Sequence, residues 1–225
     1  MTKHFVTIIL ASTILCALHA QSFDIGGIAG VDYNRDIGNS FNISLEEEIK
    51  FSNYFSNYDR FKSGISIDYS HPKYDKFKIG VGADYLNKNE TEYYDSRFRW
   101  NATFSYSEKY RQYKFSYRAR FQSTYRDENR GDYKLNPKNY LRNRLEVGYT
   151  FYTKPIKLAL STELFLRLNN PEGNFIDNIR TTFEVNYRFT RRSSMSFFVR
   201  SDNEIQVKNP LNAVYAGVVY KFSDK

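Results

Sequence analysis

The sequence has 225 residues, of which 41% are hydrophobic and 18% aromatic, and its formal net charge is +8. This length is sufficient for one all-β domain. The mean hydropathy of -0.64 excludes a helical membrane protein but not a membrane β-barrel, whose apolar residues take only alternate positions.

Residues 1–20 are predicted to be a secretory signal peptide. A basic start precedes the apolar run 5–18, and a cleavage site follows at Ala20. The alternative is a lipoprotein signal with a lipidated Cys16, which the bulky Leu15 before it disfavours. Cleavage removes the one cysteine of the sequence and so excludes disulfides and thiolate metal sites. An exported basic chain rarely meets nucleic acid, and we expect no nucleic-acid partner.

The mature chain begins with a glycine-rich stretch, residues 21–38. We interpret this stretch as either an extra strand or a loosely held N-terminal segment. Residues 39–225 form a second predicted unit with ten strand-like stretches, in which apolar residues alternate with polar ones. The ten stretches are approximately 40–51, 60–70, 76–86, 95–107, 111–124, 139–151, 156–168, 177–189, 194–207 and 212–222.

The stretches 139–151 and 156–168 show the alternation most clearly. In the first of them, every second residue from Leu145 to Phe151 is apolar. The residues of the opposite parity, Arg142, Arg144 and Glu146, are charged. Since side chains alternate across a strand, one face is apolar and the other carries charge. Strands of about 10 to 13 residues can cross a bilayer. We therefore predict an all-β, antiparallel up-and-down transmembrane β-barrel of about ten strands, with lipid outside and charge inside. A soluble lipocalin-like barrel would reverse this pattern.

Connections between the stretches alternate in length. The longer ones are 52–59, 87–94, 125–138, 169–176 and 208–211, and the shorter ones are 71–75, 108–110, 152–155 and 190–193. Outer-membrane barrels have short periplasmic turns and longer external loops, so we predict the cell outer membrane, with both ends of the mature chain on the periplasmic side. Ten strands fit that arrangement and eleven do not. The loop 125–138 is the expected contact for an external ligand or partner, whose identity the sequence leaves open.

Strands that run toward the periplasm end with outward aromatic residues. The predicted periplasmic aromatic girdle contains Tyr69, Tyr106, Tyr149, Phe151, Tyr187, Phe189, Tyr220 and Phe222. Such belts mark the interface between lipid and water, whereas β-propensity alone would not favour one end of the strands. Tyr33 extends the series into residues 21–38. An extra strand over residues 23–33 therefore stays open as the alternative to a count of ten.

The face turned away from lipid carries most of the charge. The predicted lumen charge network contains Glu46, Glu48, Arg97, Arg99, Arg118, Arg120, Arg142, Arg144, Glu146, Glu163, Arg167, Arg180, Glu184 and Arg188, and the same parity adds Lys50, Asp68, Asp84, Lys114, Arg200, Asp202 and Glu204. An Arg or Lys that faces lipid at the midplane costs about 2 to 4 kcal/mol, which enforces this segregation. Glu47 breaks the pattern, and we interpret it as a bulge or a rim position.

Two functions fit such a lumen. A network of ion pairs and water would fill it, which predicts a structural or interaction role. Alternatively, a basic wall on three consecutive strands would select anions in a narrow, porin-like channel. The wall contains Arg97, Arg99, Arg118, Arg120, Arg142 and Arg144. An enzyme is least favoured, because the mature chain has one histidine, His71, and its inward glutamates lie among arginines. We expect no catalytic residue, no metal site and no cofactor.

Short motifs give the chain a family resemblance. Paired arginines alternate in RFRW, YRAR and LRNRLEVGY, and they are followed by Glu163, by Arg180 and by a final strand that ends in Tyr and Phe. Together with the leader peptide, this order resembles the uncharacterised bacterial envelope barrels grouped as domain of unknown function 2490. The resemblance implies an outer-membrane barrel without established activity, whose partners are outer-membrane lipid and the barrel insertion machinery. That machinery commonly reads a terminal aromatic residue, whereas residues 223–225 follow Phe222 here.

Overall fold

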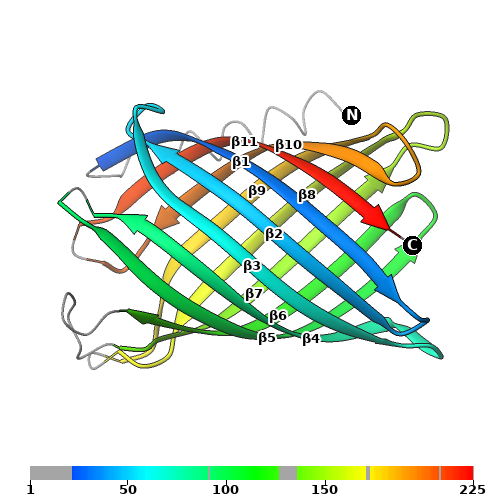
Figure 1. Ribbon diagram of the computed structural model, residues 1–225, viewed down its shortest axis with the longest axis horizontal. Coiled ribbons are helices and arrows are strands. Elements are labelled where there is room, and N and C mark those ends of the chain that lie inside the picture. Colours follow the sequence, from blue (N-terminus) through cyan, green and yellow to red (C-terminus); the bar gives the residue numbers. More distant parts are fainter. Residues whose placement is uncertain (1–21, 91, 127–135, 171–172, 208, 225) are drawn as a thin grey trace.

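The computed structural model describes residues 22–90, 92–126, 136–170, 173–207 and 209–224. In these ranges the chain folds into one closed β-barrel of eleven strands (Figure 1). The strands are β1 (Ser22–Ile37), β2 (Phe41–Ser52), β3 (Asn57–His71), β4 (Tyr74–Asn89), β5 (Tyr94–Tyr110), β6 (Tyr113–Arg126), β7 (Lys138–Thr150), β8 (Ile156–Arg167), β9 (Phe175–Arg188), β10 (Ser193–Glu204) and β11 (Leu211–Asp224). No helix in the described ranges is long and apolar enough to span a membrane. The predicted signal peptide and most of the loop 125–138 lie outside the described residues.

The barrel closes through a parallel pair. Each strand from β1 to β11 pairs antiparallel with the next, and β1 then pairs parallel with β11, from Ser22 beside Leu211 to Arg35 beside Asp224. The predicted β-barrel is confirmed, and residues 22–37 form its extra N-terminal strand. The preference for ten strands over eleven is wrong, because a parallel closing pair accommodates an odd number. The two described ends consequently lie at opposite ends of the barrel, not at the same end.

The strands are long and strongly tilted, as Figure 1 shows, and they contain 12 to 17 residues each. The predicted alternation of connections is present. The connections after β1, β3, β5, β7 and β9 contain two to five residues and define the turn end of the barrel. Those after β2, β4, β6, β8 and β10 contain four to eleven residues and define its loop end. The longest connection follows β6 at the loop end, and both ends agree with the pattern expected of outer-membrane barrels.

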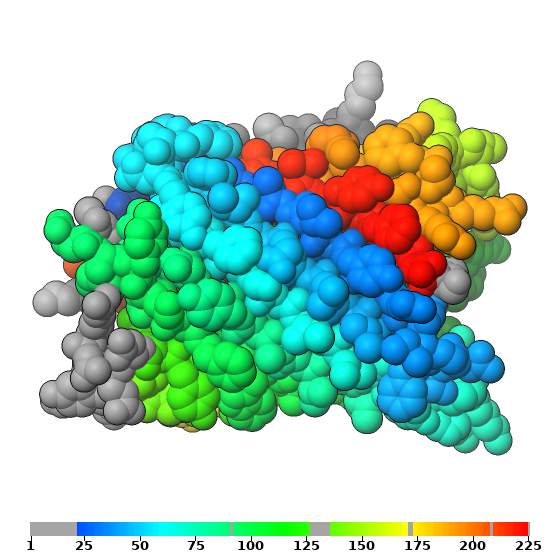
Figure 2. Space-filling model, in the orientation of Figure 1, coloured from blue at the N-terminus to red at the C-terminus, as the bar shows by residue number. Residues whose placement is uncertain are grey.

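The outer wall is apolar. Large hydrophobic side chains are exposed on it at mid-strand, for example Leu145 at 64% and Val81 at 63%. Similar exposed residues come from most other strands, and they include Val31, Leu45, Ile65, Phe104, Phe115, Phe183 and Phe197. Side chains of β1, β2 and β11 form a continuous outer surface (Figure 2). An apolar exterior of this extent around a polar interior is the arrangement of a transmembrane barrel, because lipid then replaces water at the wall.

The β2–β3 connection holds the start of β1. The ladder between β1 and β2 begins only at Gly27 beside Phe51. At the start of β1, the Asn53 amide of the connection donates a hydrogen bond to the Asp24 carboxylate (2.8 Å), and the Tyr54 amide donates one to the Ile25 carbonyl (2.8 Å). Three successive residues, 53–55, take left-handed φ angles of 51°, 54° and 67° to bring these amides into position. Such angles are unfavourable for non-glycine residues, so the contacts with β1 stabilise the turn as well as the strand.

Glu47 lies on the outer wall in regular β-structure. The register between β2 and β3 is continuous from Phe41 to Lys50, and the irregularity comes after Lys50. The interpretation of Glu47 as a bulge or a rim position is therefore wrong. Its carboxylate accepts a hydrogen bond from the Ser63 hydroxyl on the neighbouring strand (2.7 Å). This bond partly compensates a polar group on an apolar face.

A small apolar cluster fills the lumen beside the closing seam. Ile28, Phe198 and Tyr215 are buried there with Ala213, and Val219 packs against them. Gly217 makes room for this cluster, because a Cβ atom at that position would lie 2.1 Å from the Phe198 ring. Apolar packing inside the barrel thus supports the β1–β11 pair, whereas the rest of the lumen is lined by charged side chains.

Gly217→Ala is expected to lower the free energy of unfolding by about 1 to 3 kcal/mol, because the added methyl overpacks a rigid ring. Urea unfolding in lipid vesicles, followed by the emission of the single tryptophan, Trp100, measures this change. Gly148→Ala is the matched control, since a Cβ there meets neighbours only at 3.7 Å. Equal stability of the two variants would show that the Phe198 ring is not held against β11.

Candidate functional site

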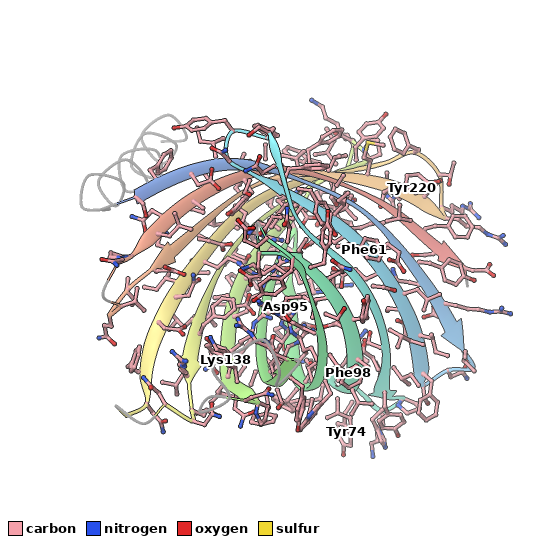
Figure 3. The ribbon with its side chains drawn as sticks, turned by 60° about the vertical axis from the view of Figure 1, so that its left-hand side comes forward. Phe61, Tyr74, Asp95, Phe98, Lys138 and Tyr220 are labelled. Atoms are coloured by element: carbon pink, nitrogen blue, oxygen red, sulfur yellow. The ribbon has the colours of Figure 1, made fainter. Side chains whose placement is uncertain are left out.

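The lumen contains a series of adjoining cavities, and charged side chains crowd it (Figure 3). A central cavity of about 270 Å³ lies between a turn-end cavity of about 820 Å³ and a loop-end cavity of about 250 Å³. The central and turn-end cavities share Arg144, Glu184 and Lys221 as lining residues. The central and loop-end cavities share Arg60, Arg99, Arg142 and Arg180. Thin layers of charged side chains therefore separate the cavities along the barrel axis.

Each of the three cavities has more basic than acidic residues in its lining. The central cavity is lined by ten basic and six acidic residues. The turn-end cavity has seven basic and two acidic residues, and the loop-end cavity has four and two. The four basic residues of the loop-end cavity are those that it shares with the central cavity, and its other charged residues, Asp177 and Glu204, are acidic. The excess of positive charge therefore lies in the central and turn-end cavities, where low-dielectric walls concentrate its field.

Most of the predicted lumen residues lie together. Ten of the fourteen line the central cavity: Glu46, Glu48, Arg99, Arg118, Arg120, Arg142, Arg144, Glu163, Arg180 and Glu184. Glu146 and Arg188 line the turn-end cavity. Arg97 and Arg167 line neither of these cavities nor the loop-end cavity.

Four further charged residues line the central cavity that the sequence did not assign to it: Asp32, Arg60, Lys62 and Lys221. Arg60 and Lys62 share the parity of Asp68 on β3, and that shared parity is the signal that could have placed them inside. Asp32 lies on β1, whose status as a strand was open. Lys221 follows Tyr220 on β11, so its inward direction follows from the outward direction of the tyrosine.

Glu163 is the hub of the ion pairs. It is 3% exposed, and its carboxylate accepts hydrogen bonds from Arg118 Nη2 (2.8 Å) and from Arg142 Nη2 (2.8 Å) and Nε (3.2 Å). Arg142 also donates to the Gln122 side-chain oxygen (2.8 Å). Bidentate pairs of this kind are both stronger and more directional than single charged bonds. They fix three strands of the wall, β6, β7 and β8, to one another from inside.

A second set of contacts extends this hub across β9 and β10. The Phe165 ring lies between two guanidinium groups, with Arg142 at 4.4 Å and Arg180 at 4.9 Å from its centroid. Arg180 in turn makes a bidentate pair with Asp202, at 2.5 and 3.1 Å. Stacking on an aromatic face is favourable for a poorly solvated cation. The layer between the central and loop-end cavities is thus held by both charge and stacking.

The predicted basic wall is divided by the strand register. Arg118 lies directly opposite Arg144, and Arg120 directly opposite Arg142. The arginines of β5 lie nearer the loop end, where Arg97 faces Arg126. Four of the six wall residues therefore form one compact group on β6 and β7. Arg99 contributes to the central cavity separately, with its guanidinium 3.7 Å from Asp84.

Arg97 belongs to the loop-end rim. It pairs with Asp95 at 2.7 Å and with Glu90 in the β4–β5 connection. Burial opposes ionisation of Glu90, but the hydrogen bond and charge of Lys88 and the charge of Arg97 outweigh that effect and lower its pKa. Arg97 consequently joins β5 to the β4–β5 connection and does not line the three cavities.

The eight predicted girdle aromatics lie at the turn end, and seven of them contact another aromatic ring on an adjacent strand or two residues away. Ring centroids are 5.2 Å apart for Phe41 and Tyr69 and 5.0 Å apart for Phe77 and Tyr106. Tyr220 projects from the outer wall (Figure 3). The remaining contacts of the girdle are Tyr113 with Tyr149, Tyr149 with Phe151, Tyr187 with Phe189 and Tyr33 with Phe222. A second aromatic group, including Phe61, Phe98 and Trp100, is exposed nearer the loop end and was not predicted.

The described residues offer little for catalysis. His71 lies at the end of β3 at the barrel rim, where its Nδ1 accepts a hydrogen bond from the Lys73 amide (3.1 Å). Among the residues that the structure describes, no group of three or more His, Cys, Asp or Glu side chains could hold a metal ion. The charges of the lumen are instead arranged as pairs and as an excess of cations, which suits binding or passage of anions.

Comparison with known proteins identifies a family. The model of the family described as "Protein of unknown function (DUF2490)" matches residues 29–210. No curated protein matches the sequence. Among solved structures, the NanC porin has a TM-score of 0.52 at 15% identity, with 79% of this chain and 86% of that chain covered, and this likeness establishes the barrel fold. An anion-selective porin from Comamonas acidovorans has a TM-score of 0.39 at 12% identity, covering 85% of this chain and 54% of that one, a likeness too low to support an argument. Because the family model covers most of its length, the chain belongs to the DUF2490 family, as its motifs indicated.

Proposed function

We propose that the protein is a narrow, anion-preferring channel in the outer membrane. The observation that supports this proposal is the series of adjoining cavities, which together are lined by fifteen basic and nine acidic residues when shared residues are counted once. Rings of basic side chains raise the local concentration of anions and repel cations. The ion-paired layers between the cavities restrict passage to small solutes.

The predicted export signal and the apolar outer wall support a location in the outer membrane. Outer-membrane lipid is then the partner of the wall, and the barrel insertion machinery is the partner during assembly. We propose no enzymatic role, because His71 lies at the rim and the inward glutamate Glu163 is held by arginines.

A sealed barrel with a structural or interaction role is the second candidate. The observation that favours it is the set of ion pairs around Glu163 and Arg180, which join neighbouring strands and narrow the lumen. The central cavity of about 270 Å³ is also small. In this case the same charges would stabilise the barrel and its external surface would carry the function.

Single-channel recording in planar bilayers, with potassium chloride at different concentrations on the two sides, tests the channel. The purified barrel is expected to conduct with a reversal potential that indicates chloride preference. Arg120→Glu and Arg144→Glu each exchange a positive for a negative charge in the central cavity, and each is expected to lower the preference at least about threefold. Arg191→Glu makes the same change on an exposed turn and serves as the control.

Two results would contradict the channel. A folded barrel that shows no current above that of the empty bilayer would favour the sealed barrel. A current that prefers potassium, or that responds equally to Arg120→Glu and Arg191→Glu, would show that the cavity charges do not select the ion.

A further inference from the structure

Four arginines form a compact group in the central cavity, which we call the arginine block: Arg118, Arg120, Arg142 and Arg144. They occupy two adjacent antiparallel strands, with Arg118 opposite Arg144 and Arg120 opposite Arg142. Side chains that face each other across such a pair have Cβ atoms about 4.5 to 5.5 Å apart, and like charges there are destabilising. The arrangement is therefore unfavourable for folding unless anions compensate it.

The carboxylates of the protein compensate only part of this charge. Glu163 pairs with Arg118 and Arg142, and Glu146 pairs with Arg144 at 2.5 Å. Arg120 donates from Nε to the Thr103 hydroxyl (3.1 Å) and has no carboxylate partner within ion-pair distance among the described residues. Four guanidinium groups thus share two directly paired carboxylates, which leaves the group with a net charge of +2 and Arg120 without a direct counter-ion.

The block also has unused hydrogen-bond donors. The Nε atoms of Arg118 and Arg144 are buried and have no hydrogen-bond partner. A buried donor left unsatisfied costs about 1 to 3 kcal/mol. All four arginines line the central cavity, whose volume of about 270 Å³ accommodates a small polyatomic ion. The guanidinium groups that carry the uncompensated charge therefore border one space, and a small rotation of Arg118 or Arg144 would bring its unused donor to an ion bound there.

We infer that the arginine block binds a small oxyanion with two negative charges, of the class of sulfate and hydrogen phosphate, in the central cavity. This inference deepens the proposed function and rests on it, since the ion that the channel prefers would be held at this point of its path. Several planar guanidinium groups can donate to one tetrahedral oxyanion at the same time, and two negative charges match the excess of the block. The ligand can be the free ion or a phosphate ester group on a larger solute.

Titration calorimetry on the folded, detergent-solubilised barrel tests the site, with sodium sulfate as the probe at constant ionic strength in sodium chloride. Saturable binding at one site is expected. Arg120→Gln is expected to raise the dissociation constant at least about tenfold, because it removes the guanidinium with no direct counter-ion. Arg120→Lys keeps the charge but not the planar fork, and its dissociation constant is expected to fall between those of the unchanged protein and Arg120→Gln.

Arg188→Gln removes one charge from the adjoining turn-end cavity and measures the effect of overall charge. Screening by salt over about 8 to 10 Å should keep its effect below about threefold. Equal losses in Arg120→Gln and Arg188→Gln, or no saturable binding of sulfate, would overturn the site. If Arg120→Gln does not fold, Arg120→Lys provides the same comparison.

Two further measurements separate this inference from the proposed channel. Glycerol phosphate in place of sulfate distinguishes an ester-bearing solute, if it binds more tightly, from the free inorganic ion. Chloride conductance of the same preparation is recorded in parallel. Conductance without sulfate binding would overturn the site and leave the channel intact, whereas sulfate binding in a barrel without conductance would support the site and overturn the channel.

Discussion

Glu163→Gln is expected to lower the free energy of unfolding by about 3 to 5 kcal/mol, because it leaves two arginines inside the barrel without their shared carboxylate. Glu163 is 3% exposed and Arg142 is 8% exposed, so water replaces little of the lost interaction. Arg118 loses its only carboxylate partner among the described residues. Glutamine has nearly the same shape as glutamate, and the change therefore isolates charge from packing.

The measurement is equilibrium unfolding in urea from lipid vesicles. Trp100 is the single tryptophan of the sequence, lies on the outer wall and reports the loss of lipid contact. Glu146→Gln is the matched control, since it removes a carboxylate from one half-buried arginine, and it is expected to cost about 1 kcal/mol or less. Losses of similar size in the two variants would show that Glu163 is not the hub of the lumen.

Leu145→Arg is expected to lower the stability of the folded barrel in lipid by about 2 to 4 kcal/mol, the cost of an arginine at the bilayer midplane. Leu145 lies near the middle of β7, points outward and is 64% exposed. The side chain of the preceding residue, Arg144, points inward and lines the central cavity. Two adjacent positions therefore have opposite requirements for charge.

Tyr152→Arg provides the comparison for this prediction. Tyr152 is 76% exposed in the turn between β7 and β8, where an arginine costs about 0 to 1 kcal/mol because it lies outside the hydrocarbon region. The same unfolding measurement in vesicles applies to both variants. A Leu145→Arg protein as stable as Tyr152→Arg would mean that water, and not lipid, surrounds the barrel wall.

The alternation of side chains made the barrel predictable. Leu145 and Arg144 are adjacent in the sequence, and their opposite directions follow from strand geometry alone. The same alternation correctly predicted that ten of the lumen residues face one cavity, because all inward side chains of a closed barrel share one interior. No pairing between strands was needed for these conclusions.

Features that depend on pairing were not predictable in this way. Alternation shows that Arg97 points inward but not where it lies along the barrel axis. The register with β6 places it at the loop-end rim, beside Arg126. Alternation does not reveal that Arg118 faces Arg144, a contact set by the register in which β6 pairs with β7. The status of β1 was open because its glycines weaken the alternation, and because its partner β11 is distant in the sequence.

That distance determines when the barrel can close. The Ser22 hydroxyl meets the Pro210 carbonyl across 188 positions of sequence, so β1 must wait for nearly the whole chain. The entropic cost of closing so large a loop grows only slowly with its length. The greater hazard is kinetic, because the sheet remains an open ribbon whose first and last strands offer unpaired amides and carbonyls to any other strand. Pairing of β1 with β11 removes both edges at once, so the last step of folding is also the one that ends this exposure.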